Sequence, residues 1–254
     1  MSYISLKDKV TIVTGAASGI GRASAIIFAQ NGAKVVVADI DDVGSRKTVE
    51  TIEKGGGRAI FVKTDVSNAT DAKQCVDSAV REFGRLDCLF NNAGFNPVGT
   101  VVSTSEELWD RVLAVNLKGM FLMCKYAIPE MKRAGRGAIV CTASVDGVLA
   151  IPNEAAYIAT KGGIISLVKA MALDHAKENI RVNCVLPGAI RTPLYEKFLK
   201  ENEDFGDQAD QHAMGRIGEP EEIGRVVMFL LSDEPTFVTG AIIPVDGGYS
   251  AVKV

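Results

Sequence analysis

The chain has 254 residues, of which 47% are hydrophobic and 23% are charged, and its formal net charge is -3. This composition is typical of a globular protein with a large core, and the dispersed lysines and arginines argue against a nucleic-acid partner. Residues 1–9 lack the basic start and apolar stretch of a signal peptide, and no apolar run approaches the ~20 residues that span a bilayer. Five irregularly spaced cysteines favour reduced, buried thiols in a cytoplasmic protein. His175 and His212 stand alone, so neither a metal site nor a Ser-His-Asp hydrolase is expected.

Short apolar runs alternate with helical spacing along the whole chain. The first run, residues 9–14, opens onto glycines and is followed by a helical pattern over 21–30. Further strands are predicted near 34–38, 59–63, 86–90, 137–142, 180–186 and 241–245, with helical patterns between them that include 106–132 and 155–177. Nearly continuous apolar strands alternating with helices predict a parallel sheet covered on both faces. We therefore expect one α/β domain over residues 1–254, a doubly wound sheet of seven strands.

The segment 191–214 breaks this rhythm. It is polar around residues 201–207 and follows Pro187 and Gly188 at the carboxyl end of the sixth predicted strand. Ligands bind at that edge of open α/β sheets, which favours a substrate lid over a solvated surface excursion.

A glycine-rich loop, TGAASGIG at 14–21, joins the first strand to the first helix. A dinucleotide pyrophosphate needs backbone N–H groups at a helix N-terminus and close approach, which side chains would obstruct. Gly15 and Gly19 suit the turn and the approach, and Gly21 allows the helix to lie close to the strand. The spacing is GxxxGxG rather than GxGxxG, and glycines at such a junction are often only turn formers.

Asp39 ends the second strand, where a carboxylate can accept hydrogen bonds from an adenosine ribose. The same charge repels a 2′-phosphate, and the adjacent Asp41 and Asp42 add to it, while Arg22 is the only nearby base. A turn-forming acid at a strand end is the alternative. Together with the glycine loop, Asp39 predicts NAD in preference to NADP.

Small and polar residues also end the third and fourth strands. Asp65 and the backbone of Val66 can cap an adenine, and Asn91-Asn92-Ala93-Gly94 lets the chain pass under a cofactor, with Asn91 bonding backbone. Such residues are also frequent in turns.

Tyr157 and Lys161 lie one turn apart on a predicted helix, for which Asn153 is the expected N-cap. A nearby ammonium and an oxidised nicotinamide favour the phenolate of a tyrosine whose free pKa is near ~10. Tyr157 can then move a proton at a substrate oxygen while Lys161 holds the nicotinamide ribose. Ser144 follows the fifth strand and can polarise the same oxygen. Asn116, polar within an apolar helical pattern, can hold a water that relays protons to Lys161.

These motifs, in this order, resemble the short-chain dehydrogenase/reductase family. The resemblance rests on 14–21, Asp39, Asp65, NNAG at 91–94, Asn116, Ser144, YIATK at 157–161 and PG at 187–188, and reaches VDGG at 245–248. It implies a single Rossmann domain with the strand order 3-2-1-4-5-6-7 and a catalytic tetrad of Asn116, Ser144, Tyr157 and Lys161. It also implies a homotetramer formed through helices 106–132 and 155–177. It also implies that Thr192 contacts the nicotinamide carboxamide.

The expected cofactor-binding residues are Gly15, Ser18, Gly19, Ile20, Gly21, Asp39, Ile40, Asp65, Val66, Asn92, Ala93, Gly94, Tyr157, Lys161, Pro187, Gly188, Ile190 and Thr192. The candidate substrate-pocket residues are Phe95, Asn96, Val145, Asp146, Leu149, Asn153 and the segment 191–214.

The predicted function is hydride transfer between NAD(H) and a secondary alcohol or ketone, such as a sugar, cyclic or aliphatic alcohol. A 3-oxoacyl-thioester reductase of the same family is the alternative, although such reductases usually draw on NADPH. A Rossmann methyltransferase has no use for the Tyr157–Lys161 pair, and a non-catalytic dinucleotide sensor would not need the tetrad. The pocket residues select neither a substrate nor a direction of reaction.

Overall fold

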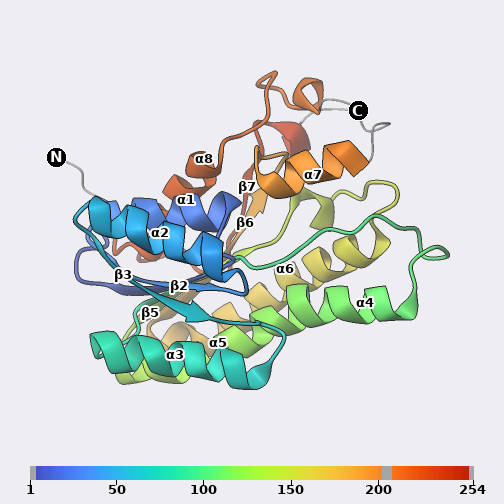
Figure 1. Cartoon of the computed structure of the whole chain (residues 1–254). Helices are drawn as coiled ribbons and strands as arrows, with labels where there is room; N and C mark the ends of the chain where they lie inside the picture. Colours follow the sequence, from blue (N-terminus) through green and yellow to red (C-terminus); the bar gives the residue numbers. More distant parts are fainter. Residues whose placement is uncertain (1–3, 202–207, 252–254) are drawn as a thin grey trace.

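A computed structural model describes residues 4–201 and 208–251 and places one sheet between two layers of helices (Figure 1). The sheet contains seven parallel strands in the order β3-β2-β1-β4-β5-β6-β7. The strands are β1 (Val10–Thr14), β2 (Lys34–Asp39), β3 (Arg58–Lys63), β4 (Cys88–Asn91), β5 (Gly137–Thr142), β6 (Ile180–Pro187) and β7 (Ile242–Val245). The predicted single doubly wound domain and its strand order are confirmed.

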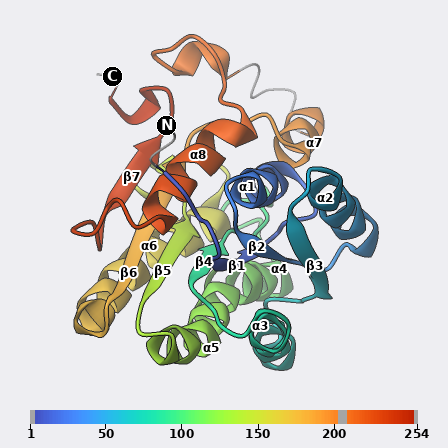
Figure 2. The same ribbon diagram turned by 90° about the vertical axis from the view of Figure 1, so that its left-hand side faces the viewer.

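Helices cover both faces of the sheet (Figure 2). One face carries α1 (Gly19–Gln30), α2 (Asp42–Lys54) and α8 (Pro220–Leu231); the other carries α3 (Ala69–Phe83), α5 (Gly119–Arg133) and α6 (Ala155–His175). Two shorter helices, α4 (Glu106–Val112) and α7 (Pro193–Glu201), follow β4 and β6. The central strands are therefore buried on both faces, which explains why they have continuous apolar runs rather than alternating ones.

The two faces of the sheet have separate hydrophobic cores. Phe28 of α1 meets Phe90 of β4 edge-on in one core, with ring centroids 6.1 Å apart. Ile139 of β5 and Met123 of α5 belong to the other core. All five cysteines are buried free thiols. Because burial disfavours the thiolate, it raises the pKa of Cys75 to about 12, as expected for structural rather than reactive cysteines.

The structure departs from the predicted helix over 106–132. A π-helical turn, Leu113–Lys118, separates α4 from α5, and Pro129 lies inside α5. Such turns occur frequently at functional sites, and this one contains the buried Asn116. The periodicity of the apolar residues did not reveal it.

The predicted N-cap of α6 is wrong. Glu154 occupies the N-cap position, while Asn153 is exposed and has a left-handed backbone with φ +63°. Asparagine tolerates that conformation better than most residues, which accounts for its position in the turn before the helix.

Candidate active site

A cavity of about 900 Å³ opens at the carboxyl ends of the strands. This is the edge at which open α/β sheets bind ligands. Its walls come from the loops after β1, β2, β3, β4, β5 and β6, from the start of α6, and from α7. Of the expected cofactor-binding residues, all but Gly21 line it, and of the tetrad, all but Asn116 line it.

The glycine loop forms one end of the cavity. Gly15 has φ +68°, in the left-handed region that favours glycine. A Cβ on Gly21 would lie 2.1 Å from the carbonyl oxygen of Gly15, so α1 can approach the loop only because this residue is glycine. The structure thus gives Gly21 the packing position predicted for it. A cradle that side chains would fill, at the N-terminus of α1, fits the pyrophosphate of a dinucleotide.

Asp39 lies at the end of β2, on the cavity wall beside Ile40. Its Oδ2 accepts a hydrogen bond from the backbone N–H of Ala17 at 3.0 Å, and its Oδ1 accepts one from Asp41 at 3.0 Å. These bonds fix the carboxylate between the glycine loop and the start of α2. The position fits a carboxylate that accepts from ribose hydroxyls, and it disfavours a phosphate at the same place.

Thr14 connects the ends of β1 and β4. Its hydroxyl accepts hydrogen bonds from the backbone N–H groups of Asn92 at 2.8 Å and Ala93 at 3.0 Å, and it donates to Asn91 Oδ1 at 3.3 Å. Asn91 Nδ2 donates to the carbonyl of Met120 at 2.9 Å, as predicted for a backbone contact. The floor of the cavity is therefore rigid.

Asp65, predicted to contact an adenine, lines the cavity. Its Oδ1 accepts from the backbone N–H of Ser67 at 2.9 Å and from the Ser67 hydroxyl at 2.6 Å. A contact from Asp65 to an adenine amino group remains a prediction.

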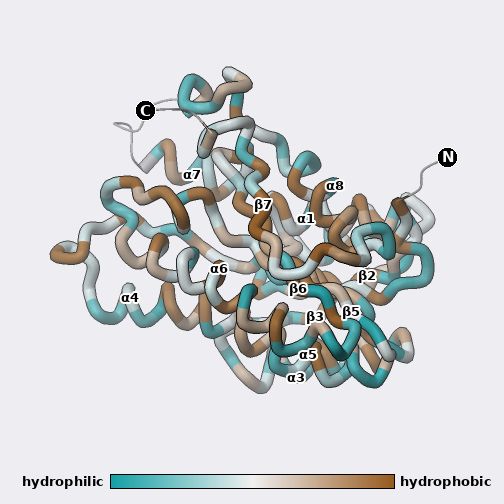
Figure 3. Tube along the Cα trace, turned by 180° about the vertical axis from the view of Figure 1, so that it is seen from behind, coloured by the Kyte–Doolittle hydropathy of each residue, from teal (hydrophilic) through white to brown (hydrophobic). Residues whose placement is uncertain are grey.

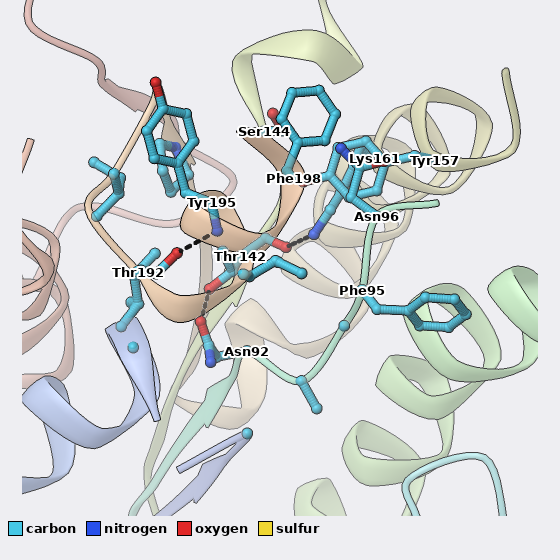
Figure 4. A pocket seen from close by; sticks show the side chains of 18 of the residues that line it. Asn92, Phe95, Asn96, Thr142, Ser144, Tyr157, Lys161, Thr192, Tyr195 and Phe198 are labelled. Carbon is cyan, nitrogen blue, oxygen red and sulfur yellow. Dashed lines mark hydrogen bonds between the residues drawn. The ribbon is translucent and has the colours of Figure 1, made fainter. Parts of the chain in front are cut away.

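Lys161 and Tyr157 meet on α6 beside Ser144 (Figure 4). Lys161 is buried, its Nζ donates to the main-chain carbonyl of Thr142 at 2.9 Å, and it lies 5.2 Å from the centroid of the Tyr157 ring. Burial lowers the pKa of Lys161 to about 8. The ammonium is therefore fixed next to the phenol and is still mostly protonated near neutral pH.

The carboxyl groups around Tyr157 oppose its ionisation. Burial raises the pKa of Tyr157, and the charges of Asp146 and Glu154 raise it further. Without a further positive charge in the pocket, the phenol keeps its proton. The spacing of Tyr157 and Lys161 pointed only to the two favourable charges, the ammonium and the oxidised nicotinamide, and gave no sign of this opposing effect.

Ser144 follows β5 and is held by Asp146. The Ser144 hydroxyl donates to Asp146 Oδ2 at 2.7 Å, and the Asp146 backbone N–H donates to Ser144 Oγ at 3.2 Å. Desolvation raises the pKa of the Asp146 carboxyl, and its bond from Ser144 works against that rise. The hydroxyl is thus oriented at the cavity wall, where it also interacts with the Tyr157 hydroxyl.

Asn116 lies behind the cavity wall, 1% exposed. Its Oδ1 accepts from the backbone N–H of Phe95 at 3.0 Å, its Nδ2 donates to the carbonyl of Phe95 at 2.9 Å, and it reaches Thr160 Oγ1 at 3.4 Å. The buried amide has the partner that its burial demands, and that partner is the backbone after β4. A water relayed by Asn116 to Lys161 remains a prediction.

The predicted lid contributes walls on two sides of the cavity. Thr192, Leu194 and Phe198 line it from α7 and the residue before it, and Gln208 and Gln211 line it from the returning segment. Residues 202–207 of the segment lie outside the described residues. His212 anchors the return: its Nε2 accepts from the backbone N–H of Ala189 at 3.2 Å, so Nδ1 carries the proton that it donates to the carbonyl of Gln208 at 2.8 Å.

The candidate substrate-pocket residues divide in two. Phe95, Asn96, Val145 and Asp146 line the cavity, whereas Leu149 and Asn153 do not. Sequence reasoning missed Glu154, Arg111 and Tyr249, which also line it. Glu154 offered no signal, because an acid just before a helix is an ordinary helix-start residue.

A family model described as enoyl-(acyl carrier protein) reductase matches residues 15–250. The chain is 44% identical to a cyclohexanol dehydrogenase of Acinetobacter sp. (strain SE19), with 96% of each chain covered. This chain belongs to the short-chain dehydrogenase/reductase family. It is therefore an oxidoreductase.

A further relative and a solved structure are also similar to this chain. It is 40% identical to a 3-oxoacyl-[acyl-carrier-protein] reductase of Thermotoga maritima (strain ATCC 43589 / DSM 3109 / JCM 10099 / NBRC 100826 / MSB8), with 96% of this chain and 98% of the relative covered. The crystal structure of carveol dehydrogenase from Mycobacterium avium in complex with NAD superposes with a TM-score of 0.92 at 30% identity, covering 97% of this chain and 99% of that one.

Proposed function

We propose that this enzyme transfers a hydride between NAD(H) and a secondary alcohol or ketone, with Tyr157 as the general acid and base. The observation that carries the proposal is the convergence of Tyr157, Lys161 and Ser144 on one cavity whose other end is the glycine loop with Asp39. The relative named cyclohexanol dehydrogenase and the NAD complex of carveol dehydrogenase support a cyclic or similar secondary alcohol and NAD.

The bound cofactor would supply the hydride acceptor for alcohol oxidation and a positive charge in the oxidised state. Tyr157 takes the hydroxyl proton in alcohol oxidation and returns it in ketone reduction. Lys161, fixed by the Thr142 carbonyl, stabilises the phenolate and holds the nicotinamide ribose. Ser144 orients the substrate oxygen, and Asn116 acts indirectly by fixing the backbone of Phe95.

The cofactor-binding residues are proposed on the same footing. Gly15, Ser18, Gly19 and Ile20 surround the pyrophosphate, with Asp39 and Ile40 at the adenosine ribose and Asp65 and Val66 at the adenine. Asn92, Ala93, Gly94, Pro187, Gly188, Ile190 and Thr192 line the remaining length. The described parts of the segment, residues 191–201 and 208–214, are proposed to form a lid over the substrate end.

We further propose a homotetramer in the cytoplasm. The segment 106–133 and helix α6 are long and apolar enough, by length and composition, to cross a bilayer, yet both pack against the sheet as core elements. They also leave large apolar side chains exposed, including Phe121 at 46% and Leu173 at 82%. The loop before α4 adds an apolar tip (Figure 3), where Val102 is 96% exposed. Subunit association would cover such surfaces, and light scattering that gives a monomer mass would contradict it.

A 3-oxoacyl-thioester reductase is the second candidate, supported by the Thermotoga maritima relative. Asp39 weighs against it, because biosynthetic reduction usually draws on NADPH. The deciding experiment has two parts. The first follows the NADH absorbance band while NAD or NADP is supplied with a panel of cyclic and open-chain secondary alcohols. The second follows the loss of the same band when NADH or NADPH is supplied with a 3-oxoacyl thioester. Reduction of NAD by a secondary alcohol supports the proposal. Turnover of the thioester alone, with NADPH, would replace it by the second candidate.

A further inference from the structure

Two buried polar atoms at the substrate end of the cavity have no hydrogen-bond partner within the described part of the chain. They are Oε2 of Glu154 and Oδ1 of Asn96. Glu154 is 2% exposed, and both residues line the cavity. An unsatisfied buried polar group is costly, so these two atoms require a partner that the described residues do not supply.

The two side chains are held in place as a pair. Asn96 Nδ2 donates to Glu154 Oε1 at 2.8 Å, which leaves Asn96 Oδ1 and Glu154 Oε2 as the two atoms of the pair without a partner among the described residues. The backbones around them are also joined: the N–H of Gly99 donates to the carbonyl of Asn153, and the Ala155 N–H donates to the Gly99 carbonyl at 3.1 Å. The unsatisfied oxygens therefore belong to a fixed arrangement.

The start of the loop that carries Asn96 is fixed independently. Asn116 holds both the N–H and the carbonyl of Phe95 through its side-chain amide. The residue before Asn96 thus cannot rotate away from the cavity without breaking two buried hydrogen bonds.

The chemistry of this pair selects its ligand. The amide Oδ1 of Asn96 can only accept a hydrogen bond, whereas a protonated Glu154 carboxyl can donate from Oε2. A hydroxyl group satisfies both atoms at once, because it donates to Asn96 and accepts from Glu154. A ligand carbonyl would leave Asn96 unsatisfied.

The acidic groups at this end of the cavity narrow the class of substrate further. Glu154 and Asp146 interact electrostatically, and burial raises the pKa of the Glu154 carboxyl to about 7, with Asp146 contributing. The Asp146 carboxylate would repel an ionised substrate carboxylate or phosphate, and such a group has no proton to donate to Asn96 Oδ1. The substrate end of the cavity is suited to a neutral molecule.

We propose that the Glu154–Asn96 pair binds a second hydroxyl group of the substrate, so that the preferred substrate is a neutral diol oxidised at the hydroxyl next to Tyr157. This inference rests on the proposed function and names the substrate class of the same site. Glu154 is one helical turn before Tyr157, which places the second hydroxyl close to the reacting one.

The test compares kcat/KM for cyclohexanol, the positional isomers of cyclohexanediol, and the matching aminocyclohexanols, with NAD. The wild-type enzyme should prefer at least one diol over cyclohexanol by roughly tenfold or more, the size expected for one well-made hydrogen bond to a charged or polar pair. In Glu154→Leu that ratio should fall to about one, and in Glu154→Gln, which retains a hydrogen-bonding atom in place of Oε2, it should be largely kept. The ratio cancels any general loss of activity.

Asn153→Gly is the matched control. It changes the polar neighbour of Glu154, keeps the left-handed backbone and lies outside the cavity wall, so its ratio should equal that of the wild type. Equal use of cyclohexanol and every diol by the wild type would overturn the inference and assign the two oxygens to a bound water. A preference for an aminocyclohexanol would overturn the hydroxyl assignment. If none of these alcohols reduces NAD, the proposed function itself has failed.

Discussion

Replacing Gly21 by alanine tests the contact on which the glycine loop depends. The added Cβ would lie 2.1 Å from the Gly15 oxygen and 2.7 Å from the Gly15 carbonyl carbon. That peptide cannot easily yield, because the N–H of Gly15 is bonded to the carbonyl of Ala38 at 2.9 Å. Helix α1 and the loop must therefore move apart.

The expected loss follows from two opposing effects. Alanine in a helix gains about 0.5–1 kcal/mol over glycine, while forcing an extra methyl into a packed contact costs typically 1–3 kcal/mol or more. We expect Gly21→Ala to be destabilised by about 1–2 kcal/mol, which lowers the Tm by roughly 2–8 °C for a chain of this size. The affinity for NADH should fall by at least about tenfold, because the N–H groups of the loop move with Gly15.

The assays are thermal unfolding and NADH binding followed by fluorescence. Ser24→Ala is the matched control, since Ser24 is a fully buried residue of the same helix whose hydroxyl has no partner among the described residues. Removing that hydroxyl should leave NADH binding unchanged and the Tm unchanged or higher. A Gly21→Ala enzyme with the wild-type Tm and NADH affinity would refute the reasoning.

Three further changes test other parts of the site. Asp39→Ala should relax the discrimination against NADP, measured as the ratio of kcat/KM for the two cofactors, and a wild type that already uses both equally would contradict the role of Asp39. Asn116→Leu leaves two backbone groups of Phe95 unpaired and should lower the free energy of unfolding by roughly 2–4 kcal/mol. The kcat should also fall, because the cavity wall loosens. An unchanged midpoint of denaturant unfolding would count against this role of Asn116. The pKa of Glu154 rises from 4.5 to about 7 on folding, so the folded chain binds more protons than the unfolded chain in this window and loses stability as the pH rises through it. Glu154→Gln lacks this group, so its Tm relative to the wild type should increase between about pH 5 and pH 8, and a constant difference would show that the carboxyl titrates normally.

Residues whose role depends on their position in a strand, at a strand end or at a strand–helix junction were predictable from the sequence. The apolar runs and the intervening helices define the sheet, because buried parallel strands leave a continuous pattern. Asp39 and Gly21 were assigned correctly in position, since a strand end and a strand–helix junction fix where a side chain lies.

Residues that act through contacts between distant segments were not predictable. The bond of Glu154 to Asn96 joins positions far apart in sequence, and Asn116 reaches Phe95 across the fold. The π-helical turn that contains Asn116 has the same apolar spacing as an ordinary helix. Nor does the spacing of Tyr157 and Lys161 show that Asp146 and Glu154 oppose the phenolate. These effects depend on burial and distance, which only the folded chain determines.

The proposed reaction mechanism depends most directly on Tyr157. Steady-state oxidation of a secondary alcohol by Tyr157→Phe, measured at the NADH band beside a binding titration with NADH, tests it in one variant. Loss of the proton-transfer group should lower kcat by about 10²–10⁴ or abolish turnover, while NADH binds with nearly wild-type affinity. A variant that turns over at close to the wild-type rate would contradict the assignment of Tyr157 as the acid and base.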